Sequence, residues 1–166
     1  MTNKIEELKR ANEELKKENE ELDKKAYEVA EAAKKSAGSN WYSLAKDQLN
    51  EIDDKIRANK RQITKNNMAS LNVGDGVSLS PMTDWTPYTV IERRETAGGF
   101  ILTIQEDNAI RIDSNGQSNH QEYRYERNPE GPTRIMTWNN KKETFTVSGG
   151  TTYIGLGRRC YDDPSY

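Results

Sequence analysis

The first part of the chain carries a heptad repeat, and this repeat is the strongest constraint on its fold. One core position of the repeat holds Ile5, Asn12, Asn19, Ala26 and Ala33, and the other holds Leu8, Leu15, Leu22, Val29 and Ser36. Core residues that alternate three and four apart form one stripe on a helix, and a slightly under-wound helix keeps that stripe against a partner. The spacing therefore predicts a coiled-coil helix over about residues 4–36.

Asparagine occupies two of these core positions, Asn12 and Asn19. A buried Asn costs stability unless it meets a polar partner, so it favours one register or one oligomeric state over others. The alternative is a poorly optimised seam whose polar positions stay wet.

A short interruption over residues 36–40 separates this helix from a second one. Gly38 suits a helix C-terminus, and the segment over about residues 41–66 again has one apolar face. That face contains Tyr42, Ala45, Leu49, Ile52, Ile56, Asn59 and Ile63. A short Gly-containing turn predicts a helical hairpin, and two hairpins from two protomers would form a four-helix bundle. A longer, nearly continuous helix is the alternative, and Asn66–Asn67 is interpreted as the linker that ends this segment, residues 1–67.

The remaining residues, 71–166, have the pattern of an antiparallel β domain. Two pairs of β-prone runs flank turns, residues 88–94 with 100–106 and residues 133–138 with 144–147, and each pair predicts a hairpin. Residues 123–127 alternate aromatic and charged side chains, which places the two kinds on opposite faces of a strand. Short strands at regular spacing indicate a small barrel-like sheet. The expected fold class is α+β, with a helical coiled coil or hairpin before a small antiparallel β barrel-like domain.

Composition and charge exclude several classes of protein. The chain is 33% apolar, below the usual range of about 45–50%, with a net charge of −2. A balanced charge gives no basic field for DNA, and no apolar run approaches the ~20 residues that span a bilayer. The N-terminus lacks the apolar core of a signal peptide, and the single cysteine cannot form an internal disulfide. We therefore expect a cytosolic homo-oligomer, joined through its N-terminal helices, that binds neither membrane nor DNA.

The sequence offers little for catalysis. His120 is the only histidine and Cys160 the only thiol, and a lone Cys–His pair without a third group is weak evidence for a nucleophile. No CxxC, HExxH or Walker-type phosphate loop occurs. We expect no enzymatic activity, no metal and no cofactor.

Residues 71–166 are instead rich in arginine and aromatic residues. Guanidinium groups match phosphate oxygens and stack on rings, and aromatic faces stack on bases, so the combination suits a nucleotide ligand. The run Gly155-Leu156-Gly157 suggests a close approach of backbone N–H groups to a phosphate.

Several motifs in this half carry a resemblance to a known family. They are Ile104-Gln105-Glu106-Asp107-Asn108-Ala109-Ile110-Arg111, Asp113-Ser114-Asn115-Gly116, the run from Gln121 to Gly131, Gly157-Arg158-Arg159 and Tyr161-Asp162. This pattern resembles small β domains encoded by tailed phages, and a β domain of this type after dimerising helices resembles the anti-Thoeris sponge proteins. The resemblance implies a protein of the infected host's cytoplasm that sequesters a nucleotide second messenger, glycocyclic ADP-ribose, without degrading it. Cyclic oligonucleotides are a second ligand class implied by similar sponges.

The resemblance also implies where the ligand would bind. Arg158 and Arg159 would clamp phosphate oxygens, Tyr123 or Tyr125 would stack on adenine, and Arg111 would close over the base. Asp113 or Asn115 would accept ribose hydroxyls. The expected ligand-binding set is Arg111, Asp113, Asn115, Tyr123, Tyr125, Arg158, Arg159 and Tyr161.

Three other functions are open on sequence grounds. A structural phage protein could use the coiled coil as an anchor and the β domain as a decoration of the particle. An enzyme could degrade the same nucleotide, and a single-stranded nucleic-acid binder could use the same arginines and rings, although such grooves are generally positive.

Overall fold

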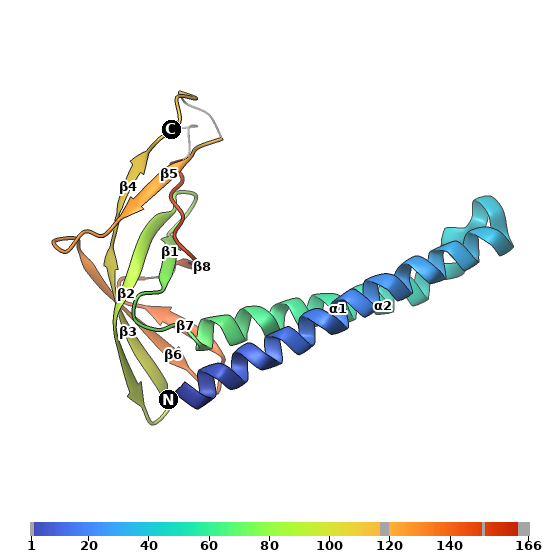
Figure 1. Cartoon of the computed structure of the whole chain (residues 1–166), viewed down its shortest axis with the longest axis horizontal. Coiled ribbons are helices and arrows are strands. Elements are labelled where there is room, and N and C mark those ends of the chain that lie inside the picture. Colours follow the sequence, from blue (N-terminus) through green and yellow to red (C-terminus); the bar gives the residue numbers. More distant parts are fainter. Residues whose placement is uncertain (1, 117–119, 151, 163–166) are drawn as a thin grey trace. The chain divides into compact units, whose positions relative to one another are not determined.

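The computed structural model describes residues 2–116, 120–150 and 152–162, and the chain divides into two compact units. The first unit is Met1–Ser70 and the second is Leu71–Tyr166. The first is helical and the second is built of antiparallel strands, so the predicted α+β class is confirmed (Figure 1). No helix in the described part of the chain has an apolar stretch long enough to cross a membrane.

The helical unit is a hairpin. Helix α1 (Thr2–Ala37) is followed by a single 3₁₀ turn, η1 (Gly38–Asn40), and by helix α2 (Trp41–Ala69), which runs back along α1 (Figure 1). Gly38 has a φ of +52°, a left-handed conformation that glycine adopts without the steric cost of a Cβ, and this residue ends α1. The hairpin prediction is therefore confirmed over the continuous helix.

Amide side chains cross the interface between the two helices. Asn12 Nδ2 donates to Asn67 Oδ1 at 2.7 Å, and Asn66 Nδ2 donates to Asn12 Oδ1 at 2.9 Å. These three side chains join the helices near the open end of the hairpin. Closer to the turn, Asn59 Nδ2 donates to Asn19 Oδ1 at 3.1 Å, and the two groups of bonds together are called here the amide ladder. Both core asparagines meet polar partners across the seam, so they pair the helices in one register.

The structure corrects the sequence-based description of this unit at the end of α2 and at two residues of the seam. Helix α2 runs to Ala69, so Asn66–Asn67 belongs to the helix and is not a linker. The two asparagines stay helical because their amides bond to Asn12 instead of to their own backbone. Tyr42 and Ser36, both expected in the seam, are exposed beside the turn at Gly38.

The second unit contains a curled antiparallel sheet and a two-stranded ribbon (Figure 1). The six strands of the sheet, in spatial order, are β7 (Thr144–Val147), β6 (Thr133–Asn139), β3 (Gly99–Glu106), β2 (Thr86–Thr96), β1 (Gly76–Ser80) and β8 (Tyr153–Leu156). Strands β4 (Asn108–Arg111) and β5 (Tyr123–Glu126) form the ribbon. Both predicted hairpins are confirmed, as β2 with β3 and β6 with β7.

One face of the sheet forms the apolar core of this unit. Its buried residues are Val77, Leu79, Tyr88, Val90, Phe100, Leu102, Ile104, Met136, Trp138 and Phe145. A β-bulge between Val90 and Glu92 shifts the register of β2 against β3, and such bulges increase local twist and bend a sheet. Beyond the bulge Arg93 lies 3.7 Å above the centre of the Phe100 ring, a cation–π contact that packs the end of the core.

The opposite face of the same strands carries polar residues near β1 and β8. Ser78, Ser80 and Thr89 are all buried there. Gly155 of β8 lies under Trp85, since a Cβ on this glycine would sit 2.9 Å from the indole ring. Strand β8, which the sequence pattern does not predict, is therefore covered by Trp85 on this face. The polar side chains of the neighbouring strands are buried on the same face.

Candidate functional site

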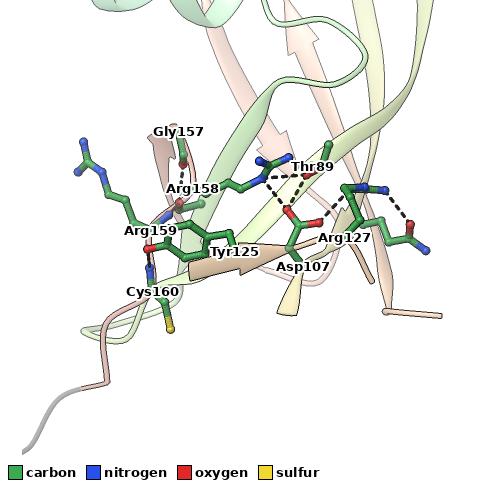
Figure 2. Close-up of polar contacts among 10 residues, drawn as sticks. Thr89, Asp107, Tyr125, Arg127, Gly157, Arg158, Arg159 and Cys160 are labelled. Carbon is green, nitrogen blue, oxygen red and sulfur yellow. Dashed lines mark hydrogen bonds and ion pairs between the residues drawn. The ribbon is translucent and has the colours of Figure 1, made fainter. Parts of the chain in front are cut away.

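The candidate site is a cluster of polar side chains at the point where the sheet meets the ribbon. It consists of Thr89, Gln105, Asp107, Arg127 and Arg158, called here the Asp107 cluster. Thr89 and Gln105 are register partners on β2 and β3, and Asp107 is the single residue between β3 and β4. Arg127 follows β5, and Arg158 follows β8. Four segments that are distant in sequence thus contribute to one cluster (Figure 2).

Asp107 is the centre of this cluster. Its carboxylate has no solvent exposure, and it accepts from Arg158 Nε at 2.8 Å on one oxygen and from Arg127 Nη1 at 2.9 Å on the other. The Thr89 hydroxyl also donates to Asp107 Oδ2, at 2.5 Å. A buried carboxylate requires such partners, because an isolated charge inside a protein is costly. Two guanidinium groups against one carboxylate leave the cluster with one surplus positive charge.

Further hydrogen bonds hold both arginines. Arg158 Nη2 donates to Thr89 Oγ1 at 2.7 Å, and Arg127 Nη2 donates to Gln105 Oε1 at 3.1 Å. Gln105 in turn donates to the carbonyl oxygen of Pro129 at 2.7 Å and so anchors the turn after Arg127. Within the described residues, Nη1 of Arg158 and Nε of Arg127 make no hydrogen bond.

The segment 157–162, called here the C-terminal strap, is held against β1 by its backbone. Gly157 N donates to Gly76 O at 3.0 Å, Ser78 Oγ donates to Gly157 O at 2.6 Å, and Arg159 N donates to Ser78 Oγ at 2.7 Å. The Arg158 side chain then runs over Gly76, where a Cβ would lie 2.7 Å from its Cγ. Glycine at this position therefore makes room for the stem of Arg158.

This arrangement corrects the predicted role of Gly155-Leu156-Gly157. Gly155 and Leu156 belong to β8 and pair with β1, and the Gly157 N–H is donated to Gly76. Gly155 packs closely beneath Trp85, Gly157 has a left-handed φ of +79°, and the Gly157 N–H does not point to an open site.

The predicted tyrosines lie on one face of the ribbon, against the strap. Tyr123 is paired with Arg111 and Tyr125 with Ala109, so these four residues share a face. Tyr125 Oη accepts a hydrogen bond from the backbone N–H of Cys160 at 3.0 Å. Figure 2 shows the Tyr125 ring beside the strap, between its backbone and Asp107.

Tyr123 joins the ribbon to the end of the strap. Its hydroxyl lies 2.9 Å from Gln121 Oε1 and 3.3 Å from Asp162 Oδ2, and Gln121 Nε2 donates to Asp162 O at 2.7 Å. Burial, followed by the nearby Cys160 and Asp162, raises the pKa of Tyr123 to about 12. The phenol therefore stays protonated and remains a donor to the strap.

Arg111, Asp113 and Asn115 organise their own loop. Asp113 accepts two hydrogen bonds from Arg111, at 2.9 and 3.0 Å, and one each from the backbone N–H groups of Asn115 and Glu122, both at 2.8 Å. Asn115 Nδ2 donates to the carbonyl oxygen of His120. The hydrogen bond from Arg111, followed by those from the two backbone N–H groups, lowers the pKa of Asp113 well below its usual range. Four donors occupy the acceptor positions of this carboxylate, which leaves none for a ribose hydroxyl.

The two remaining predicted residues belong to the strap. The Arg159 side chain is exposed and points away from Asp107 (Figure 2). Tyr161 pairs with Trp85 through two backbone hydrogen bonds, at 2.9 and 3.2 Å. Arg158 and Arg159, expected to act as one clamp, thus face different directions.

Sequence reasoning missed Thr89, Gln105, Asp107 and Arg127 as members of the cluster. The available signal was Asp107, a charged residue that directly follows the apolar alternation of residues 100–106 and precedes another strand. A carboxylate at that point must find cations, and Arg127 and Arg158 are the arginines that the folded chain brings to it.

Cys160 lacks the environment of a reactive thiol. Burial raises its pKa, and the negative charge of Asp162 adds to the effect. A raised pKa keeps the thiol protonated at neutral pH, whereas the thiolate is the nucleophile. Within residues 2–116, 120–150 and 152–162, no group of three or more His, Cys, Asp or Glu side chains is placed to hold a metal ion.

No protein-family model, curated protein or solved structure matches this chain.

Proposed function

We propose that the C-terminal unit binds a small phosphorylated nucleotide and holds it without chemical change. The observation that carries the proposal is the surplus positive charge of the Asp107 cluster. The side chains of Arg127 and Arg158 remain 40% and 33% exposed while they neutralise a fully buried carboxylate. Each guanidinium therefore keeps N–H groups for a ligand at the surface.

The chemistry of these groups favours phosphate among anions. Guanidinium N–H groups form charge-assisted hydrogen bonds to phosphate oxygens, which are roughly twice as strong as neutral ones. Tyr125 lies beside the cluster, and aromatic rings add base stacking of about 1–3 kcal/mol per base in other nucleotide sites. Burial raises the pKa of the Cys160 thiol, which makes this group a poor nucleophile at neutral pH.

The resemblance to anti-Thoeris sponges points to the ligand. Glycocyclic ADP-ribose carries a pyrophosphate for the arginines and an adenine for a tyrosine ring. In this proposal a phage-encoded protein withholds the signal from the host's effector in the cytoplasm of the infected cell. Cyclic oligonucleotides present the same phosphate and base chemistry and are the second ligand class to test.

Calorimetry with purified glycocyclic ADP-ribose, followed by heating of the complex and chromatography of the released ligand, tests the proposal. We expect saturable heat at micromolar concentrations and full recovery of intact ligand. Arg158→Lys keeps the charge but loses the planar fork, so we expect it to weaken binding about tenfold, the equivalent of about 1.4 kcal/mol. Absence of heat with both ligand classes would refute binding, and new products would indicate an enzyme.

We also propose that two helical hairpins pair to make the protein a homo-oligomer. Near the turn, an open hollow of about 490 Å³ lies between the helices, lined among others by Val29, Ala33 and Leu44. Leu44 is 64% exposed in the single chain. An apolar hollow beside an exposed leucine suits the same surface of a second copy, because an isologous contact buries both at once.

Native mass spectrometry tests this pairing. We expect a dimer or larger species at micromolar concentration, and a shift to monomer for Leu44→Glu. Glu51→Gln, an exposed change elsewhere on α2, is the control and should leave the mass unchanged. A monomeric wild-type protein would refute the proposal.

A further inference from the structure

We infer that Asp107 is the positioning residue of the anion site, because it fixes which edge of each guanidinium group a phosphate can reach. The inference rests on the proposed function, and it adds a residue that does not contact the ligand. Asp107 has no solvent-exposed side-chain surface, so it acts only through Arg127 and Arg158.

The two arginines are held by different edges. Arg158 uses Nε and Nη2 toward Asp107 and Thr89, so its remaining edge for a phosphate is the Nη1–Nη2 end. Arg127 uses Nη1 and Nη2 toward Asp107 and Gln105, so its remaining edge is the Nε side. A guanidinium can form two parallel hydrogen bonds to a phosphate by either edge, so one carboxylate selects an end-on contact for one arginine and a side-on contact for the other.

Thr89 completes the arrangement without adding charge. Its buried hydroxyl donates to Asp107 and accepts from Arg158 Nε and Nη2, at 3.1 and 2.7 Å. The hydroxyl therefore fixes the rotation of the Arg158 guanidinium within its plane. A change at Thr89 therefore alters the orientation of Arg158 alone, whereas a change at Asp107 alters both charge and orientation.

The affinity of Asp107→Asn for an anion distinguishes two explanations, because they predict changes in opposite directions. If Asp107 only neutralises charge, Asp107→Asn raises the net charge of the cluster from one to two and tightens binding of an anion. If Asp107 positions the arginines, the same variant weakens binding although its charge is more favourable, because the guanidinium groups lose their common acceptor. We expect the second result.

The experiment measures binding of inorganic pyrophosphate and of glycocyclic ADP-ribose to the full-length protein by calorimetry at one fixed salt concentration. We expect Asp107→Asn to bind both about tenfold or more weakly, the equivalent of losing about 1.4 kcal/mol of aligned hydrogen bonding. Glu126→Gln is the matched control, because it removes one negative charge from β5 at an exposed ion pair with Arg124. We expect the control to bind as the wild type does or slightly more tightly.

Thr89→Val is the second variant, and it decides the matter if Asp107→Asn fails to fold. The change removes the hydroxyl, keeps the shape and leaves the charge unaltered, so we expect weaker binding of both ligands with a circular dichroism spectrum like that of the wild type. Binding by Asp107→Asn or Thr89→Val as tight as the wild type would overturn the inference alone. A wild-type protein that binds neither ligand would overturn the proposed function and the inference together.

Discussion

The two units of this protein bury polar side chains in contrasting ways. In the helical hairpin the buried groups are neutral amides, and Asn12 both donates to Asn67 and accepts from Asn66. In the β unit the buried polar residues include an ion, Asp107, and its charged partners are arginines that reach the surface. Neutral donors and acceptors can satisfy each other fully inside a unit, whereas this ionic cluster carries surplus charge outward. The first arrangement therefore specifies how two elements pair, and the second leaves positive charge at the surface of the unit.

The largest effect on stability is expected from isolating the buried charge. In the double variant Arg127→Met, Arg158→Met, Asp107 loses both cations and keeps Thr89. We expect the free energy of unfolding to fall by about 3–5 kcal/mol, the usual cost of stranding a buried charge. Urea denaturation followed by circular dichroism measures the change. Arg124→Met is the control, because the Arg124 side chain is mostly exposed, and it should change the free energy of unfolding by less than about 0.5 kcal/mol. An equal loss in both variants would contradict the contrast between the two units.

The amide ladder should show a smaller effect that is recovered by a second change. Asn12→Ala leaves the amides of Asn66 and Asn67 without their cross-helix partner, so we expect a loss of about 1–3 kcal/mol. The triple variant Asn12→Leu, Asn66→Leu, Asn67→Leu removes all three amides, and we expect it to unfold at a urea concentration close to that of the wild type or higher. A triple variant less stable than Asn12→Ala would show that the ladder adds net stability as well as register.

Disturbing the packing beneath Arg158 is expected to lower the free energy of unfolding by as much as Asn12→Ala does, or by less. Gly76→Ala places a Cβ 2.7 Å from Arg158 Cγ and 3.1 Å from its backbone nitrogen. Relief requires the strap to move, so we expect a loss of about 1–3 kcal/mol, typical of overpacking, together with faster amide exchange over residues 157–162. Hydrogen exchange read by mass spectrometry checks both. Gly74→Ala is a poor control because its φ is +93°, and Gly98→Ala, with open space around it, is the appropriate one.

The smallest expected effect is a pH dependence from Asp113. Its pKa is lowered in the folded state, so its contribution is present above its ordinary pKa of 3.8 and is lost as pH falls toward the lowered value. We expect Asp113→Asn to be less stable than the wild type at neutral pH and indistinguishable from it in strong acid. Urea denaturation at the two pH values measures the difference. A gap that persists in acid would assign the effect to loop geometry and not to charge.

The helical unit was the more predictable part because its information is local. Heptad spacing placed the seam, and core asparagines indicated a register, since both depend on residues a few positions apart. The sequence could not show that Asn66 and Asn67, near the end of the second helix, form hydrogen bonds with Asn12. Without that partner, two adjacent asparagines look like a helix-ending linker.

The β unit was predictable in its hairpins and not in its cluster. Local turns joined β2 with β3 and β6 with β7, but β8 pairs with β1 from the other end of the unit. Arg158 reaches Asp107 only through that pairing, so no local pattern connects them. The family resemblance assigns Arg111 and Asp113 to a ligand, whereas the structure shows them bonded to each other.

The position of the strap in the chain has a consequence for biosynthesis. Arg158 follows the eight strands of the described residues, and strand β8, which brings it to β1, is the last of these to leave the ribosome. Until residue 158 has emerged, a nascent β unit carries Asp107 with Arg127 as its only cation from the cluster. If the proposed function holds, a nascent chain would therefore lack a complete nucleotide site until residue 158 has emerged.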